Sequence, residues 1–212
     1  ATVAVQGFGY VGSWAALLLK ERGCKVLAIS DVSGGYYNPK GIDVGKAIQY
    51  RNENNGTLDK FSGGDKISNE ELLSLKVDVL IPAALENAIT DKNADNIKAK
   101  VIVEGANGPT SHEADEILEK NEIIAVPDIL ANAGGVIVSY FEWVQNRLGF
   151  KWTKNRVYRR SDSIIKQSFN NVYSIAKKFK VSLRTAAYIA AIDKVSRTYK
   201  YRDGSFTFQK NG

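Results

Sequence analysis

The sequence predicts an α/β protein with a Rossmann-like, doubly wound and mostly parallel sheet, followed by a helical C-terminal extension. Three observations predict this fold. Short β-branched apolar runs alternate with amphipathic stretches through the first part of the chain, as in parallel sheets whose strands are joined by helices. Each run is continuously apolar rather than alternating, as expected for strands covered on both faces. From Gly134 onward only helical stripes remain.

In chain order, the expected strands are the five apolar runs at residues 2–6, 25–30, 77–81, 101–104 and 123–126. Helices are expected between them, because apolar residues recur there with helical spacing. These stretches are residues 13–22, 45–54 and 68–75, and one that opens at Thr110. Ser68 and Thr110 are each followed by Glu three residues later, the capping-box pattern that predicts a helix start.

Three more helices are expected in the C-terminal part, at residues 136–148, 161–178 and 182–201. Apolar residues recur in each of them every three or four positions, which is the spacing of one helix face. We therefore expect a Rossmann-like core over residues 1–150 and a basic helical extension over residues 151–212 that packs on the same domain.

Composition excludes several classes of protein. Of the 212 residues, 44% are hydrophobic and 25% are charged, which is a globular rather than a disordered or fibrous composition. A single Cys and a single His argue against a disulfide framework within the chain and against a metal site. No apolar run approaches the roughly 20 residues of a membrane-spanning helix. We therefore expect a cytoplasmic protein with no membrane contact.

Charge is unevenly distributed along the chain. Residues 1–150 carry 14 Lys and Arg against 20 Asp and Glu, whereas residues 151–212 carry 15 against 3. Residues 151–160 also interleave five cations with two aromatic residues, a pattern found in nucleic-acid-binding strips. The alternative is an amphipathic connection in which Trp152 and Tyr158 pack inward and the charges face solvent or an acidic partner. We favour the second interpretation and expect no nucleic-acid partner.

The strongest local motif is G-x-G-x-x-G, which stands directly after the first strand and opens a helix. The next strand ends at Asp31, 19 residues after Gly12. In a dinucleotide site Gly7 permits the tight turn, Gly9 lets a pyrophosphate approach the backbone, and Gly12 lets helix and sheet pack closely. The helix N-terminus then faces the phosphates. The motif therefore predicts that the core over residues 1–150 binds a dinucleotide. The candidate cofactor residues are Gly7, Phe8, Gly9, Tyr10, Val11, Gly12 and Asp31.

Asp31 bears on the choice between NAD and NADP. Its carboxylate would accept hydrogen bonds from the adenosine ribose, and its charge would repel a 2′-phosphate, so NAD is favoured. NADP stays open, because Ser30, Ser33 and Lys40 are near enough in sequence to support a phosphate if the loop curls back. In the alternative interpretation the motif is a glycine-rich turn of another α/β fold and Asp31 is a capping residue.

Longer strings resemble the glutamate dehydrogenase family. The most specific are P-A-A-L-E-N-A-I-T at residues 82–90 and S-Y-F-E-W-V-Q-N at residues 139–146, and further blocks follow in family order at residues 37–41, 104–110, 127–135 and 184–188. The resemblance covers nearly the whole chain. It implies the nucleotide-binding domain of an enzyme that transfers a hydride from the α-carbon of L-glutamate to the nicotinamide, and water then releases 2-oxoglutarate and ammonium. Tyr10 stands where the family usually has Asn.

The resemblance also suggests site residues. It matches Asn107 to a cofactor contact, Asn132 to the position beside the nicotinamide, and Ser139 to the position that touches the substrate's side-chain carboxylate. Ala83 and Ala84 follow a strand end, where small residues leave room for a nucleotide. Without the resemblance, Asn107 could form an Asx turn, Asn132 could be an N-cap with Ser139 in solvent, and the two alanines could start a helix. Asn132 and Ser139, seven residues apart, would share one face of a helix that already includes Asn132.

In the resembling family, the catalytic Lys and Asp lie in an N-terminal substrate domain, so we expect no catalytic residue in this chain. The chain starts inside its first strand, which we interpret as the C-terminal part of a longer protein. The family forms homo-hexamers mainly through the missing domain, so the isolated chain is expected to be monomeric and to bind cofactor without turnover. Two alternatives stay open: a leucine, valine or phenylalanine dehydrogenase domain, and a non-catalytic dinucleotide- or nucleic-acid-binding module.

The remaining ionisable residues are given structural roles. His112 is expected on the surface, and Cys24 as a small packed residue. Glu86, Glu104 and Asp128 have no spacing that demands a carboxylate pair, so no acid/base role is assigned to them.

Overall fold

The computed structural model describes residues 1–202 of the chain. The chain falls into two compact units, Ala1–Gly135 and Val136–Gly212. The last residues of the predicted extension, 203–212, lie outside the described part. The assignment of residues 1–150 and 151–212 to cofactor binding and to an extension stays a prediction.

The first unit is built on a seven-stranded sheet with the order β4-β3-β2-β1-β5-β6-β7. β1, β2, β5, β6 and β7 are parallel, and β3 and β4 form an antiparallel edge. The predicted Rossmann-like, mostly parallel sheet is confirmed. The strands are β1 (Thr2–Gln6), β2 (Lys25–Asp31), β3 (Gly34–Tyr37), β4 (Asp65–Ile67), β5 (Val79–Pro82), β6 (Val101–Val103) and β7 (Ile124–Val126).

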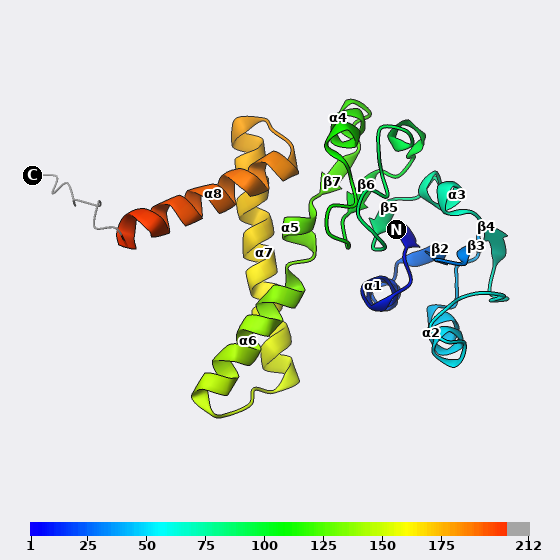
Figure 1. The fold of residues 1–212 in the computed structure, drawn as a ribbon, viewed down its shortest axis with the longest axis horizontal. Helices are drawn as coiled ribbons and strands as arrows, with labels where there is room; N and C mark the ends of the chain where they lie inside the picture. Colours follow the sequence, from blue (N-terminus) through cyan, green and yellow to red (C-terminus); the bar gives the residue numbers. More distant parts are fainter. Residues whose placement is uncertain (203–212) are drawn as a thin grey trace, which may run out of the picture. The chain divides into compact units, whose positions relative to one another are not determined.

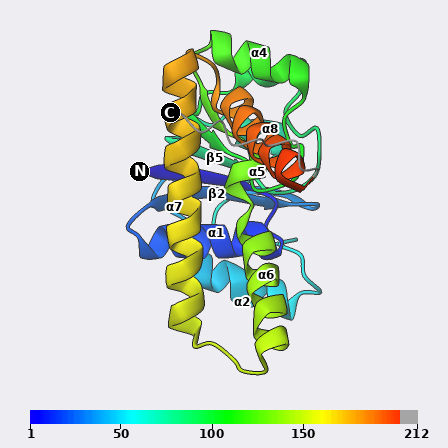
Figure 2. The same cartoon turned by 90° about the vertical axis from the view of Figure 1, so that its left-hand side faces the viewer.

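Helices cover both faces of this sheet (Figures 1 and 2). α1 (Tyr10–Glu21) and α2 (Val44–Glu53) lie on one face, and α3 (Asn69–Leu73) and α4 (His112–Lys120) lie on the other. Because side chains alternate along a strand, Val3 and Val5 pack toward α1 while Ala4 packs toward α3. Burial on both faces explains why the strands read as continuous apolar runs.

The two antiparallel strands were not predicted. β3 has the sequence GGYY and β4 has three residues, so neither contains an apolar β-branched run. The two strands approach each other closely at Gly35, where a Cβ would lie 2.9 Å from Ile67 Cγ1. The first residues of the predicted strand at 77–81 also differ, since β5 begins at Val79.

Of the two predicted capping boxes, the one at Ser68 is confirmed and the one at Thr110 is wrong. Ser68 Oγ accepts from the Glu71 N–H at 3.0 Å, and Glu71 Oε2 accepts from the Ser68 N–H at 2.7 Å. At α4 the N-cap is Ser111, whose Oγ accepts from the Ala114 N–H at 3.2 Å. Thr110 is instead held in a β-bridge with Ile89, which keeps it out of the helix.

The three helices predicted for the C-terminal part are α6 (Gly134–Leu148), which begins two residues before the second unit, α7 (Lys154–Phe179) and α8 (Leu183–Arg202). α7 begins seven residues earlier than predicted, where Thr153 caps it. The Trp152 ring is half-buried, 5.3 Å from Phe141 and within 5 Å of the Arg156 and Arg160 guanidinium groups. Trp152 therefore packs inward as expected, whereas Tyr158 is 58% exposed. Within residues 1–202, no helix is long and apolar enough to cross a membrane.

Asp78 ties the amino ends of the central strands together. Its Oδ1 accepts from Lys100 Nζ at 2.7 Å, and its Oδ2 accepts from the Thr2 N–H at 2.8 Å. The hydrogen bond from the Lys100 ammonium group, with those from Thr2, holds the pKa of Asp78 well below its usual range. A carboxyl whose pKa is lowered in the folded state stabilises the fold above its unfolded pKa of about 3.9, and this contribution is lost on acidification.

We therefore expect Asp78→Asn to lower the melting temperature at pH 7, and the difference from the unsubstituted chain to shrink as the pH falls from 5 to 3. Thermal unfolding followed by circular dichroism across this range measures it. A difference that stays constant down to pH 3 would contradict this role of the ionised carboxylate.

Candidate functional site

A cavity of about 580 Å³ opens at the carboxyl edge of the sheet. The loop after β1, the end of β2 and the loop after β5 line it, together with two residues from other elements, Gly56 and Asn69. The parallel register explains why these segments meet, because Gln6 at the end of β1 pairs with both Ser30 and Pro82. The carboxyl ends of three adjacent strands therefore lie level, which is where open α/β sheets bind ligands.

The three glycines of the motif have different physical roles. Gly7 has a φ of +87°, and a Cβ there would lie 2.7 Å from the Ala83 carbonyl. A Cβ on Gly12 would lie 1.8 Å from the Gly7 carbonyl oxygen. Folding therefore requires glycine at both positions. Gly9 is exposed, and a Cβ there would meet no atom within 4 Å. The fold does not need glycine at this position, so the open space beside its backbone is available to a ligand.

The motif also opens α1 in a way that suits an anion. Gly9 is the N-cap, and no side chain caps the first turn or places a carboxylate in it. The first N–H groups of a helix have no partner within the helix and carry its positive dipole end. Phe8 anchors the loop, because its side chain is 1% exposed and its N–H donates to the Ser30 carbonyl at 2.6 Å.

Arg51 of α2 contacts this loop from the side, which the sequence did not suggest. Its Nη1 donates to the Phe8 carbonyl at 2.9 Å and to Ser13 Oγ at 3.3 Å. Its guanidinium carbon lies 5.6 Å from the centre of the Tyr10 ring. Arg51 therefore holds the glycine loop against α2 and adds a positive charge beside it.

Asp31 lies in the cavity wall, half-buried and already hydrogen-bonded. Its Oδ1 accepts from the Ser33 N–H at 2.8 Å and the Ser33 hydroxyl at 2.6 Å, and its Oδ2 accepts from the Leu58 N–H at 2.5 Å. The carboxylate thus does cap two loops. Its two oxygens offer about four acceptor positions, so it retains capacity for a ligand hydroxyl. Its role toward ribose stays a prediction.

The sequence left open that Lys40 could support the 2′-phosphate of NADP. This suggestion is wrong in this structure. β3 runs antiparallel to β2, so the chain after it returns toward the amino end of β2, where the Asn38 N–H donates to the Leu27 carbonyl. Lys40 therefore lies toward the opposite edge of the sheet from Asp31. The Ser30 hydroxyl already donates its hydrogen bond to Asn69 Oδ1, at 2.7 Å, so it has no proton left to donate to a phosphate.

The structure brings Asn107 and Asn132 into direct contact. Asn132 Nδ2 donates to Asn107 Oδ1 at 2.7 Å and to the Ala106 carbonyl at 3.4 Å. Their loop is also joined to the cavity wall, because the Pro82 carbonyl accepts from the Gly105 and Ala106 N–H groups at 3.0 and 2.9 Å. Ala83 and Ala84, next along the chain, line the cavity, and their contact with a cofactor stays a prediction.

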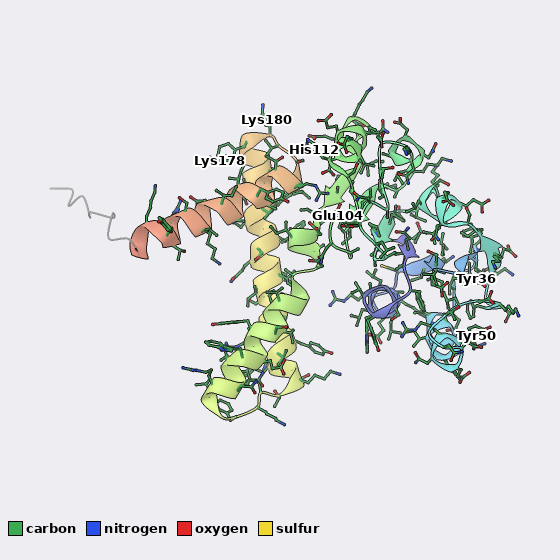
Figure 3. The ribbon with its side chains drawn as sticks, in the orientation of Figure 1. Tyr36, Tyr50, Glu104, His112, Lys178 and Lys180 are labelled. Atoms are coloured by element: carbon green, nitrogen blue, oxygen red, sulfur yellow. The ribbon has the colours of Figure 1, made fainter. Side chains whose placement is uncertain are left out.

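Two carboxylates help to hold the loop at residues 105–108, which contains Asn107. Glu104 follows β6 (Figure 3) and is fully buried, and its Oε2 accepts from the Asp128 N–H at 2.8 Å. Asp128, at the start of α5 (Asp128–Ala131), accepts from the Gly108 N–H through Oδ2 at 2.8 Å. Both groups make structural hydrogen bonds that hold the loop against α5.

The expectation that Asn132 and Ser139 share one face of a helix is wrong. Asn132 is the C-cap of α5, and α6 begins only at Gly134. Ser139 is an exposed residue of α6 in the second unit. The substrate role of Ser139 stays a prediction.

The cavity wall includes residues that sequence reasoning missed. Val32 is 98% exposed although apolar, and Asn69 lies at the start of α3. Gln6 is a polar residue at the end of an otherwise apolar strand, which was a signal in the sequence that could have been noticed. In the described part of the chain, no group of three His, Cys, Asp or Glu residues could hold a metal ion. His112 is exposed on α4 and Cys24 packs on the core, as expected.

This chain is similar to known proteins over most of its length. Residues 1–203 match the sequence profile of the family described as Glutamate/Leucine/Phenylalanine/Valine dehydrogenase. The chain is 56% identical over 203 residues to a glutamate dehydrogenase of Thermotoga maritima, covering 95% of this chain and 49% of that protein. It is 46% identical over 202 residues to the cryptic catabolic NAD-specific glutamate dehydrogenase of Bacillus subtilis, covering 95% of this chain and 47% of that protein.

A solved structure agrees with the sequence comparisons. The crystal structure of the hetero-hexameric glutamate dehydrogenase from Thermus thermophilus superimposes with a TM-score of 0.88 at 32% identity, covering 95% of this chain and 47% of that one. This chain spans about half the length of each of these three proteins.

Proposed function

Since this chain belongs to the Glutamate/Leucine/Phenylalanine/Valine dehydrogenase family, we propose that it is the coenzyme-binding domain of a glutamate dehydrogenase. The overall reaction would convert L-glutamate, water and NAD⁺ into 2-oxoglutarate, ammonium, NADH and a proton. The bound nicotinamide would supply the chemistry by accepting a hydride at C4. The residues of this chain would hold and orient the cofactor.

The glycine loop carries this proposal. Gly7 and Gly12 are glycines because the fold leaves no room for a Cβ, whereas a Cβ on Gly9, which lines the cavity, would meet no atom within 4 Å. A pyrophosphate placed there would meet the uncapped N–H groups of α1 and the positive end of its dipole. The Arg51 guanidinium group, bonded to the Phe8 carbonyl, would keep the loop in this conformation.

The two halves of the cofactor would lie on either side of this loop. Asp31, on the β2 side, would accept from the adenosine ribose. The Asn107 and Asn132 amides, on the β6 side, would contact the nicotinamide half. Because the bond from Asn132 Nδ2 to Asn107 Oδ1 uses one donor and one acceptor, it leaves Asn132 Oδ1 and Asn107 Nδ2 as the groups for a ligand.

The other parts of the proposal concern the whole enzyme. Its partners would be L-glutamate or 2-oxoglutarate and an N-terminal substrate domain that holds the catalytic Lys and Asp, and Ser139 would contribute to the substrate site. Assembly as a hexamer is supported by the Thermus relative, which is a hetero-hexamer. NAD is supported as the cofactor by the NAD-specific Bacillus relative and by the charge of Asp31. A cytoplasmic location is part of the same proposal.

Cofactor titration of Asp31 variants tests this assignment. Asp31→Ser is expected to weaken NADH binding by at least tenfold, because a charge-assisted hydrogen bond contributes about 1.5–3 kcal/mol, and to reduce discrimination against NADPH. Asp31→Asn removes the charge but keeps one acceptor oxygen, so it can still cap one of the two loops. Comparison with Asp31→Ser therefore separates the loss of charge from the loss of capping. Energy transfer from the three Trp residues to NADH or NADPH measures both affinities.

Asp65→Ser is the control, since Asp65 is an exposed aspartate on the edge strand β4 outside this cavity. If both Asp31 variants remain folded and bind NADH and NADPH as the unsubstituted chain does, Asp31 acts only as a loop cap and the cofactor assignment loses its main side-chain support.

A further inference from the structure

Gln6 lines the cavity and, in the described part of the chain, carries a polar atom without a hydrogen-bond partner. It is the last residue of β1 and only 9% exposed. Within residues 1–202, its side-chain oxygen Oε1 is buried and has no hydrogen-bond partner. A buried acceptor without a partner costs about 1–3 kcal/mol, so such atoms are uncommon in folded proteins.

The strands on either side of Gln6 offer its Oε1 no donor. Side chains alternate along β1, so Gln6 continues the face of Ala4, which packs toward α3. On the same face its register partners are Ser30 and Pro82. The Ser30 hydroxyl already donates to Asn69 Oδ1 at 2.7 Å, and proline has no N–H. The neighbouring Ala83 N–H donates to the main-chain carbonyl of Gln6.

The geometry points to Gln6 as a further cofactor-binding residue, whose side-chain amide turns about its last bond so that Oε1 accepts a hydrogen bond from a ribose hydroxyl of the bound dinucleotide. This inference rests on the proposed function. Gln6 directly precedes Gly7, whose backbone abuts Ala83. It therefore lies in the wall next to the segment that would hold the pyrophosphate. In a dinucleotide each phosphate is joined to a ribose, so the ribose hydroxyls are the donors nearest to this position.

The inference predicts that replacing Gln6 by an apolar residue has different effects on the stability of the ligand-free chain and on its affinity for the ligand. In the ligand-free chain Oε1 gains no hydrogen bond, so an apolar side chain of the same shape should be neutral or stabilising. In the complex the same substitution removes a hydrogen bond. A residue with only a structural role would not separate ligand affinity from stability in this way.

Gln6→Met is the informative variant, because methionine is unbranched and close to glutamine in shape. We expect NADH to bind between about three- and tenfold more weakly, while the melting temperature of the ligand-free chain is unchanged or higher. Fluorescence titration and thermal unfolding measure the two quantities. Gln49→Met is the matched control, because Gln49 is an exposed residue of α2 and its substitution should change neither.

Three ligands identify the ribose. If Gln6→Met weakens AMP, ADP-ribose and NADH alike, the hydroxyl belongs to the adenosine ribose. If the variant weakens only ADP-ribose and NADH, the hydroxyl belongs to the second ribose.

The outcomes that contradict the inference are distinct from failure of the proposed function. Unchanged NADH affinity in Gln6→Met, with tight binding by the unsubstituted chain, would overturn only the role of Gln6. A lowered melting temperature together with weakened binding would show a structural role and would overturn it too. No NADH binding by the unsubstituted chain would overturn the proposed function itself.

Discussion

Gly9→Val is expected to abolish NADH binding while leaving the chain folded. No atom lies within 4 Å of the position that a Cβ would take, and the φ of Gly9 is −76°, which any residue can adopt. The added side chain would therefore cost the fold little. It would instead occupy the space that a pyrophosphate needs in order to reach the N–H groups of α1. Circular dichroism and thermal unfolding report the fold, and fluorescence titration reports NADH affinity.

Gly12→Ala is the contrasting variant at the same motif. Its Cβ would lie 1.8 Å from the Gly7 carbonyl oxygen, so α1 would have to move away from the loop and the fold should be destabilised. Normal NADH affinity in folded Gly9→Val would show that the glycine loop is not part of the site.

The second large effect is expected in catalysis. The 212-residue chain should bind NADH but should not oxidise L-glutamate above background. Among the described residues that line the cavity there is no Lys or His, and the carboxylates there are Asp31 and Glu86. Glutamate oxidation needs groups that polarise a carbonyl and carry protons, and a cleft that excludes water. The family resemblance assigns these groups to the substrate domain.

The assay follows NADH formation with L-glutamate, using protein purified from a host that lacks its own glutamate dehydrogenase. Gly9→Val serves as the blank, and a separately produced substrate domain is added to test whether some activity returns, although much of the proximity advantage of one chain would be lost. L-Leucine in place of L-glutamate tests the related substrate class. Turnover within tenfold of about 10 per second by the chain alone would contradict the assignment, and Glu104, Asp128 and Lys92 would then be re-examined as catalytic groups.

The sequence by itself determined the order and type of most elements. Strands such as β1 and β2 could be predicted because burial on both faces demands a continuous apolar run. The glycine motif could be predicted because its spacing along the chain is itself the structural requirement. The long helix α7 could be predicted because it repeats one apolar face over many turns.

Only the tertiary structure decided which polar groups meet in the site. Arg51 reaches the Phe8 carbonyl from 43 residues away, Asn132 reaches Asn107 across 25 residues, and Leu58 binds the carboxylate of Asp31 across 27. It also decided that Thr110 joins a β-bridge instead of capping α4. A single polar residue carries no periodic signal, so its partner depends on strand order and register, which long-range packing sets.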